Sequence, residues 1–496
     1  MRKTIVVILF IAVLLPFNAT IIKSKNMSIT SEYVGDFDPL VDIQVTVNIQ
    51  AIRYLEDDQT NNAKSAHSMF KDLFFKAKNT DNKQHGFYVK IFINDEEYTS
   101  EIFSDSLYMY NLNWTATLNV PDDKETVNIK IQLWDTGDGK TGDVLCDISG
   151  DSGDSEDSYD AEMEYNIKTG HWSGDDNLGN DLSGYGRLCG TDDGTIYKKD
   201  RDSELWFNIY QNDYDGDGIP YWAEVNEYGT DPKQKNTGDP DEDKIPVQWE
   251  YKWGYDPFSW ENHEKLDPDG DSINNYEEYL TQQWFSDPNR KDVFVELDIM
   301  DEGPNGEKTY FPEIAEELIQ TAFDRQNIVF HLDYGDMGGT DIIPFDSLST
   351  GSEIRAIYQK YFLNGAEWRR GVFHYGVVVY QVDGPNGYTF NPNAFQISSN
   401  GLEKKSKNPA LHRNIVYASC YMHELGHTFN FHPIPGHNDN SKYPWQIGWW
   451  INQPYKSCMN YAWVFRIVDY SDGSRPPPDI DDWSRIDYSF FEREWR

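Results

Sequence analysis

The chain has 496 residues, of which 38% are hydrophobic and 15% aromatic, so it can build buried cores over two to four domains and is not a disordered polypeptide. Its formal net charge is −41, from 84 acidic and 43 basic residues, which excludes nucleic acid as a direct partner and makes anionic membrane surfaces poor ones. The carboxylates either bind divalent cations or serve solubility in a high-salt habitat, and their patterning favours calcium.

The N-terminus begins with two basic residues, followed by the apolar run Ile5–Phe17 and then by small and polar residues. This order is typical of a secretory signal peptide, which we place at residues 1–25, with an uncleaved signal anchor as the alternative. The remaining chain is therefore expected to be secreted or held at the extracellular cell surface. Export permits disulfides, and neighbourhood in the sequence favours the pairs Cys146–Cys189 and Cys420–Cys458.

In residues 30–210, runs in which apolar and polar residues alternate are separated by turn-forming residues, which is typical of an all-β domain. Strands at this spacing predict a β-sandwich, which would serve as an accessory domain. The clearest predicted strands are Val41–Ile52, Gly86–Asn94, Trp114–Val120, Thr126–Trp134 and Glu204–Tyr210.

One acidic loop in this region follows a strand that ends in "WD" and carries Asp135, Asp138, Asp143 and Asp147. A strand that leads into an acidic loop in this way resembles the calcium-and-phospholipid-binding sandwich of synaptotagmin-like proteins. The resemblance implies contact with a cell surface or with lipid through the β-sandwich. Solvated turn residues without a ligand are the alternative interpretation.

Residues 211–290 contain an internal repeat with a period of roughly 27 residues. The three copies begin at Asp213 ("DYDGDGIPYWAE"), Asp239 ("DPDEDKIPVQWE") and Asp267 ("DPDGDSINNYEE"). Each copy has acidic residues at loop positions one, three and five, isoleucine at position seven and glutamate at position twelve. The predicted calcium ligands are Asp213, Asp215, Asp217, Glu224, Asp239, Asp241, Asp243, Glu250, Asp267, Asp269, Asp271 and Glu278.

This spacing is that of an EF-hand-type loop, in which alternate side chains turn inward, residue seven offers its carbonyl and the glutamate binds through both oxygens. The copies resemble thrombospondin type 3 and dockerin-like calcium repeats. The resemblance implies a spacer that bound calcium stiffens. An acidic linker without bound metal is the alternative. Only the first loop has glycine at position six, Gly218, whereas Lys244 and Ser272 stand there in the others. We therefore expect the first site to be the best formed and the second the weakest.

From residue 291 the pattern changes to alternating strands and helices, which predicts an α/β layer. The predicted strands are 292–300, 327–335 and 372–380, and the predicted helices are 311–323 and 352–362. A longer helix follows, because apolar residues recur in three- and four-residue steps from Leu411 to Phe429 and form one buried stripe.

This longer helix carries the motif "HELGH". His423 and His427 are four residues apart and share one face, so their imidazoles can bind one zinc ion, with Glu424 next to a zinc-bound water as the general base. A purely structural histidine pair and an inactive metal site are the alternatives.

Farther along the chain, "KSCMNYAW" places Ser457, Met459 and Tyr461 in S-x-M-x-Y spacing. Together with the histidine helix, this turn makes residues 291–496 resemble the metzincin zinc peptidases. The resemblance implies that Met459 forms an apolar floor below the zinc and that the Tyr461 hydroxyl assists there by holding the oxyanion. It also implies that Cys458, beside Met459, approaches Cys420, so that a disulfide between them would staple the turn to the helix.

The third zinc ligand does not follow the metzincin spacing. In that clan the helix ends on a glycine and a histidine stands six residues after the second one, but here these positions are Asn430 and Pro433. Proline cannot bind metal, whereas asparagine tolerates the left-handed turn that redirects the chain. We predict His437 as the third ligand, with His432 as the first alternative and Asp439 or another carboxylate as the second.

These features predict a multidomain protein with an N-terminal all-β sandwich, a calcium-binding repeat spacer and a C-terminal α/β metzincin-like peptidase domain. The predicted function is that of an exported, calcium-stabilised, zinc-dependent endopeptidase that hydrolyses protein or peptide substrates. The second hypothesis is a cell-surface, calcium-dependent binding or adhesion protein whose zinc domain is inactive.

Overall fold

The computed structural model describes residues 43–54, 86–103, 108–109, 111–120, 125–136, 142–150, 158–176, 186–190, 201–335, 337–338, 342–362 and 367–492. The predicted signal peptide at residues 1–25 and the acidic-loop residue Asp138 lie outside these ranges. Within them, no helix combines the length and the apolar character that crossing a membrane requires.

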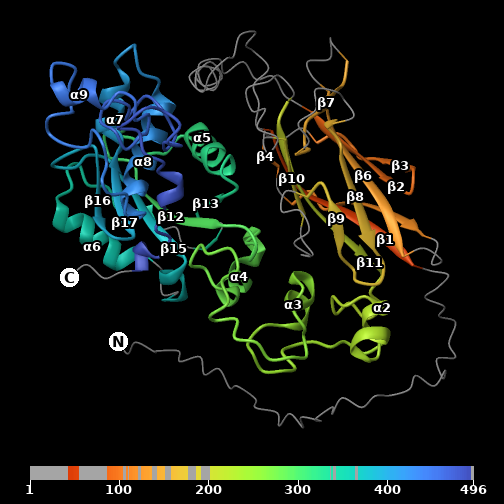
Figure 1. Ribbon diagram of the computed structural model, residues 1–496. Helices are drawn as coiled ribbons and strands as arrows, with labels where there is room; N and C mark the ends of the chain where they lie inside the picture. The colour runs from red at the N-terminus through yellow and green to blue at the C-terminus, as the bar shows by residue number, and fades with distance from the viewer. Residues whose placement is uncertain are drawn as a thin grey trace, which may run out of the picture. The chain divides into compact units, whose positions relative to one another are not determined.

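The N-terminal part of the described chain forms two antiparallel sheets (Figure 1). The first sheet contains, in order, β10 (Gly186–Cys189), β11 (Ser203–Gln211), β1 (Gln44–Tyr54) and β4 (Tyr108–Met109), with β5 (Trp114–Asn119) also paired to β1. The second contains, in order, β3 (Glu96–Thr99), β2 (Phe87–Ile93), β6 (Thr126–Asp135), β8 (Ala161–Asn166) and β9 (Trp172–Gly174), with β7 (Val144–Cys146) paired to β6.

Both sheets contribute alternate side chains to one hydrophobic core. Val45 and Val47 of β1 and Val89 and Ile91 of β2 are fully buried in the same cluster. Because a core shared by two antiparallel sheets defines a β-sandwich, the predicted N-terminal architecture is confirmed. The five predicted strands correspond to β1, β2, β5, β6 and β11, whereas the shorter strands were not predicted.

The described aspartates of the acidic loop after β6 engage protein partners. Asp135 is buried and pairs with Arg201 at 2.5 Å, and Asp143 accepts a hydrogen bond from the Tyr88 hydroxyl at 3.1 Å. Contact of this loop with lipid or a cell surface stays a prediction.

The repeat region contains short helices, each following one of the acidic loops. They are α2 (Tyr221–Ala223), continued by a π-helical turn (Glu224–Tyr228), then α3 (Val247–Trp253), and α4 (Asn275–Thr281), continued by a 3-10 turn (Gln282–Trp284). The isoleucine at position seven of each loop, Ile219, Ile245 or Ile273, is buried. Ile219 and Ile245 pack with residues of α2 and α3, whereas Ile273 packs into a core of the C-terminal sheet.

The C-terminal part is built on a mixed sheet that is parallel except at one edge. Its strands are, in order, β13 (Val329–Asp333), β12 (Asp292–Met300), β15 (Phe373–Val379), β17 (Ala394–Ser398) and β16 (Gly387–Asn391), with β14 (Ile342–Ile343) beside β12. β16 runs antiparallel to β17 and lies at the end of the sheet. The predicted α/β layer is therefore present, but this edge hairpin was not predicted.

Helices cover both faces of this sheet. Residues of α5 (Glu313–Asp324), α7 (Ser399–Ser406) and α8 (Arg413–Thr428) share one core with alternate residues of β12, whereas α6 (Gly351–Tyr361) packs into a second core on the other face. Further short helices are α9 (Ile447–Ile451) and the 3-10 turns Glu367–Gly371, Trp483–Arg485 and Phe490–Glu492.

The helix α8 is buried on nearly all sides, which corrects the prediction of one buried stripe. Fourteen of its sixteen residues are buried. The polar residues Asn414, Ser419 and Thr428 are buried along with the apolar ones, because α5, α7, the sheet and the C-terminal segment surround the helix. Its two histidines consequently lie in the interior of the domain.

Candidate metal centre

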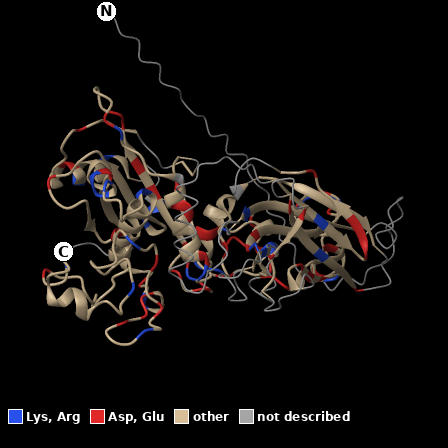
Figure 2. Ribbon diagram, turned by 90° about the horizontal axis from the view of Figure 1, so that it is seen from above, with Lys and Arg blue, Asp and Glu red and all other residues tan. Residues whose placement is uncertain are grey.

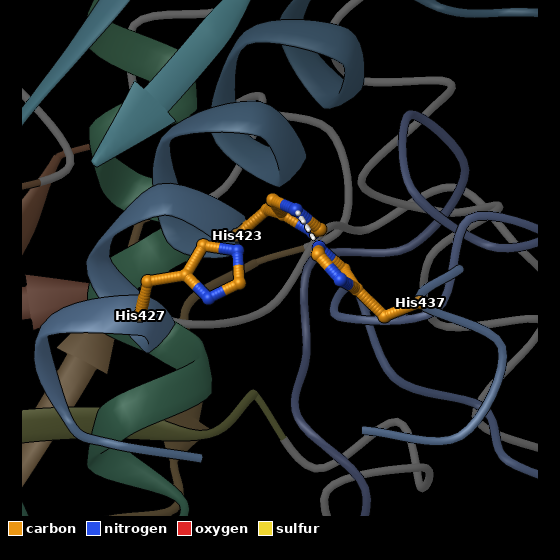
Figure 3. A group of neighbouring side chains, drawn as sticks. All are labelled: His423, His427 and His437. Carbon is orange, nitrogen blue, oxygen red and sulfur yellow. Dashed lines mark hydrogen bonds between the residues drawn. The ribbon is translucent and has the colours of Figure 1, made fainter. Parts of the chain in front are cut away.

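Three imidazoles converge where α8 faces the loop that follows it. His423 and His427 project from successive turns of α8, and His437 approaches from the loop (Figure 3). Nitrogen atoms of all three lie within 4.8 Å of one another. The Nε2 atoms of His423 and His437 are 3.3 Å apart, close to the separation of about 3.3 Å between two ligands of a tetrahedral ion with bonds of about 2.0–2.1 Å.

The chain reaches this position through two left-handed residues. Asn430 has φ 60° and ends the helix in the way the sequence suggested, and Gly436 has φ 76° just before His437. A Cβ on residue 436 would lie 2.2 Å from the side-chain oxygen of Asn460, so this tight turn requires glycine. The turn brings His437 back to α8.

The two alternative third ligands do not join the group. His432 is exposed, and its carbonyl accepts a hydrogen bond from Arg485. Asp439 is also exposed and forms an ion pair with Lys442 at 2.8 Å. Of the candidates that the sequence left open, the structure brings only His437 to the pair on α8.

A hydrogen bond to the backbone orients the first histidine. The Nδ1 of His423 lies 2.8 Å from the carbonyl oxygen of Cys458, so Nδ1 carries the proton and Nε2 keeps a free lone pair. Burial lowers the pKa of His423 to about 3 and that of His437 to about 4, and it lowers the pKa of His427 well below its usual value. The imidazoles are therefore neutral, which is the form that binds metal.

The predicted Met-turn packs directly against the histidine helix. Met459 is fully buried, and a Cβ added to Gly426 would lie 2.5 Å from its sulfur. Gly426 stands between His423 and His427 in the sequence, so the thioether lies against the helix between them. The role of Met459 as an apolar floor below a zinc ion stays a prediction.

The predicted disulfides are not formed. All four cysteines lie in the described ranges, and the structure joins none of them in a disulfide. Cys420 faces strand β16, since its sulfur would lie 3.0 Å from a Cβ on Gly387. Cys458 lies in the Met-turn, where its N–H donates to the Asp469 carbonyl at 2.8 Å. The prediction of a Cys420–Cys458 staple was wrong, since the Cys420 sulfur packs against β16, and the Cys146–Cys189 pair was wrong as well.

The carboxylate of Glu424 is buried beside the histidines. Burial raises its pKa to about 8. The Thr389 hydroxyl donates to the backbone carbonyl of Glu424 at 2.9 Å and lies 3.4 Å from its Oε2. A Cβ on Gly387 would lie 2.6 Å from Oε1 of Glu424. Strand β16 can therefore pass this close to the carboxylate only because residue 387 is glycine.

These groups line a cleft of about 500 Å³, a size typical of ligand sites. Its lining includes residues of β16, the three histidines, Glu424 and Tyr461, together with Cys420 and the exposed His432. The rings of Tyr461 and His437 have centroids 4.3 Å apart. Sequence reasoning missed Thr389 and Gly387, although the alternation in "GYTFN" is a strand signal that could have placed them beside the helix.

The three acidic loops of the repeat region share one backbone conformation. In each loop the first aspartate accepts hydrogen bonds from two later backbone N–H groups of the same loop. Position six has φ 91° at Gly218, 88° at Lys244 and 73° at Ser272. We expected only the loop with glycine at position six to turn sharply, but all three backbones turn in the same way. The hydrogen bonds to the first aspartate hold residue six of each loop in the left-handed region.

Each loop gathers several carboxylates close together. The aspartates of each copy form one group whose oxygens lie within 4.8 Å. The glutamate at position twelve is fully buried in every copy, and burial together with the neighbouring carboxylates raises the pKa of Glu224 to about 8 and that of Glu250 to about 7. Figure 2 shows how Asp and Glu outnumber Lys and Arg along the ribbon. Such sets of oxygens have the chemistry of a calcium site.

Comparisons with known proteins give only distant likenesses. No family model and no curated protein matches the chain. Human GIVD cytosolic phospholipase A2, solved with methyl gamma-linolenyl fluorophosphonate, is 12% identical with a TM-score of 0.19, over 34% of this chain and 17% of that one. A C2-type domain of plant extended synaptotagmin 1 is 12% identical with a TM-score of 0.18, over 35% of this chain and 95% of that one.

A structure described as a C2 domain is 10% identical with a TM-score of 0.18, over 34% of this chain and 98% of that one. The chain spans less than a fifth of the phospholipase structure, 17% of its length. These similarities are too low to assign a function, and the resemblance to metzincins stays a prediction.

Proposed function

We propose that the protein is an exported zinc-dependent endopeptidase of metzincin type whose repeat region is stiffened by calcium. The observation that carries this proposal is the convergence of three neutral imidazoles beside the buried carboxylate of Glu424, in a cleft of about 500 Å³. His423, His427 and His437 would hold the zinc ion. Their donor set and the 3.3 Å spacing of two of their nitrogens suit this metal.

Glu424 is the group in the cleft that would move protons. Its carboxylate would take a proton from the attacking water and then deliver it to the leaving amine. Burial raises its pKa to about 8, which favours the protonated acid at neutral pH. The positive charge of an ion held by the three histidines would favour the carboxylate form that acts as the base, and Thr389 would keep it oriented. Zn²⁺, when bound, would supply Lewis acidity toward the scissile carbonyl.

The remaining residues of the cleft would bind and orient the substrate. The Tyr461 hydroxyl would donate a hydrogen bond to the oxygen of the scissile carbonyl as negative charge develops on it. β16 is an edge strand and lines the cleft, so an extended peptide could pair with its free main-chain groups. A protein or peptide is therefore the proposed substrate class.

Calcium would act in the repeat region as a structural ion. Without a cation, each loop holds several carboxylates close together, two of them buried in every copy: Asp217 and Glu224, Asp243 and Glu250, Asp271 and Glu278. Bound Ca²⁺ would neutralise this repulsion and hold the spacer in one conformation.

The substitution Glu424→Gln tests the peptidase proposal, because it removes the base and keeps the size of the side chain. We expect the wild-type protein, loaded with zinc and calcium, to cleave an unfolded protein substrate such as reduced casein. The variant should lose activity by about 10²–10⁴-fold while retaining its zinc. Equal cleavage by both forms would contradict the proposal. Absence of cleavage by either form across a broad substrate panel would favour the calcium-dependent binding or adhesion protein.

A further inference from the structure

The second acidic loop differs from the other two in the residue that reaches its carboxylates from the following segment. In the first repeat, the side-chain amide of Asn236 donates to Oδ2 of Asp217 at 3.0 Å and to Oε1 of Glu224 at 3.1 Å. In the third repeat, the backbone N–H of Asp292 donates to Oδ2 of Asp271 at 2.6 Å. In both repeats the contacting group donates hydrogen bonds to the carboxylates, and neither is an imidazole.

The second repeat keeps a backbone donor, since the N–H of Glu261 donates to Oδ2 of Asp243 at 3.3 Å, and it adds a histidine side chain. The Nε2 of His263 lies 3.1 Å from Oδ2 of Asp243 and 3.7 Å from Oε1 of Glu250. His263 and Glu250 are 0% exposed and Asp243 is 5% exposed. The ligand atoms of these three side chains all lie within 4.8 Å of one another. An imidazole nitrogen is thus enclosed with two carboxylates away from solvent.

In this group, Oδ2 of Asp243 accepts a hydrogen bond from the Glu261 N–H at 3.3 Å, but the facing atoms of the other two side chains do not pair within the described chain. Among the described residues, neither oxygen of Glu250 nor Nε2 of His263 has a hydrogen-bond partner of acceptable geometry. Unsatisfied buried polar atoms are rare in folded proteins, and a cluster of them around one point marks the place of a bound ion or water. Both oxygens of Asp241, in the same loop, are also buried without a partner, and Asp241 is the candidate for a fourth ligand.

The other side of the imidazole is held in place by the protein. The side-chain amide of Asn275, which is fully buried, lies 3.0 Å from Nδ1 of His263, and its own oxygen has no partner within the described chain. Turning this amide by 180° lets its oxygen accept a hydrogen bond from the Nδ1–H of His263. That arrangement leaves a lone pair on Nε2 directed at the carboxylates, as in the outer shells of metal-binding histidines. The rings of Trp249 and Tyr255 pack edge-on against the imidazole.

The donor set selects the class of metal. Ca²⁺ binds six to eight oxygen atoms, whereas imidazole nitrogen is a ligand for zinc and neighbouring divalent transition metals. Distances of 3.1 and 3.7 Å bracket the separation of about 3.3 Å between ligands of a tetrahedral ion. We propose that His263, Asp243 and Glu250 form a second transition-metal site, which takes Zn²⁺-like ions in place of the Ca²⁺ proposed above for the acidic loops and is independent of the histidines on α8.

Metal counting in a full-length variant that lacks the first centre tests this site independently of any peptidase activity. His423→Ala and His427→Ala together remove two ligands of that centre. After treatment with a chelator, this double variant is dialysed against Zn²⁺ in excess Ca²⁺, and bound metal is measured by mass spectrometry. We expect about one zinc ion per chain to remain. Zinc-free protein would overturn the proposal.

Adding His263→Asn to the double variant identifies the ligand. It places in the second repeat the side chain that the first repeat has at Asn236, and we expect the bound zinc ion to be lost while circular dichroism stays unchanged. Asn236→Ala in the same background is the matched control and should leave the zinc content as it was. Zinc retained after His263→Asn would overturn the proposal.

A spectroscopic measurement covers the case in which His263→Asn fails to fold. The His423→Ala/His427→Ala protein, in which the second repeat is intact, is titrated with Co²⁺ alone. We expect the intense visible absorption of tetrahedral Co²⁺, saturating at about one equivalent and removed by added Zn²⁺. A spectrum of hexaaqua Co²⁺ throughout the titration would overturn the proposal.

Discussion

The imidazole of His423 donates a hydrogen bond from Nδ1 to the carbonyl oxygen of Cys458 over 2.8 Å. This bond connects α8 with the turn that carries Met459, two segments that are far apart in the sequence. It also fixes the tautomer, so that the Nε2 lone pair of His423 is directed toward His437. The turn therefore does two things: its methionine packs under the helix, and its backbone orients the first histidine.

The identity of the third ligand can be tested with two histidines of the same loop. We expect His437→Ala to lose the zinc of the α8 centre and the peptidase activity, because only two protein ligands would remain. His432→Ala is the matched control, since His432 is exposed, and should keep both. The comparison is best made in the His263→Asn background, where the zinc content reports this centre alone. Loss of zinc in His432→Ala with retention in His437→Ala would reverse the assignment.

The contact between Thr389 and Glu424 predicts a positioning effect. Thr389→Val removes the hydroxyl that lies 2.9 Å from the Glu424 carbonyl and 3.4 Å from its Oε2. One hydrogen bond of this kind is worth about 0.5–1.5 kcal/mol, so we expect kcat to fall by roughly 2–10-fold with unchanged zinc content. Thr389→Ser keeps the hydroxyl and should restore the rate. An unchanged kcat in Thr389→Val would show that the hydroxyl does not position the base.

Calcium removal is expected to destabilise the repeat region. At a calcium concentration about 100 times the Kd, a site contributes about 2.7 kcal/mol to the free energy of unfolding. Glu224→Gln should reduce this calcium-dependent gain, because Glu224 is the buried ligand of the first loop. Glu227→Gln, at an exposed position of the same helical segment, is the control. Thermal unfolding in calcium and in chelator measures this calcium-dependent stabilisation. An equal stabilisation in the two variants would argue against calcium at the first loop.

A buried histidine outside the metal centres predicts how stability varies with pH. His374 in β15 packs against Phe429 and Phe491, and burial lowers its pKa from about 6.5 to about 3. Between pH 3 and pH 6.5, His374 is protonated in the unfolded chain but not in the folded one. The resulting stability is present above pH 6.5 and is lost as the pH falls toward 3, by up to about 1.4 kcal/mol per pH unit.

The substitution His374→Phe isolates this contribution. Urea unfolding of the metal-free protein at pH 7.5 and at pH 5.5 should show a smaller loss of stability in the variant than in the wild type. For each protein, the free energy of unfolding at pH 5.5 is subtracted from that at pH 7.5. The difference between the two results is the part due to His374, because the other titrating groups are common to both proteins. An identical loss of unfolding free energy in both proteins would mean that His374 does not bind a proton on unfolding.

Local patterns in the sequence determined most of the architecture. Alternation predicted the main strands of the sandwich and of the α/β sheet, and the spacing of Asp213, Asp215 and Asp217 predicted the acidic loops. The four-residue step from His423 to His427 placed two imidazoles on one helical turn. Such patterns are visible because strand pleat, helix pitch and a twelve-residue loop each impose a short, fixed spacing.

Tertiary structure decided what these spacings could not. His432 and His437 were both open as third ligands, and only the path of the chain through Asn430 and Gly436 brought one of them to α8. The predicted disulfide failed for the same reason, since Cys420 and Cys458 have neighbours that no local pattern specifies. Thr389 beside Glu424, and His263 beside Glu250, are contacts between segments whose separation follows no period. They depend on how whole elements pack, and packing is set by the complete core rather than by any one stretch of sequence.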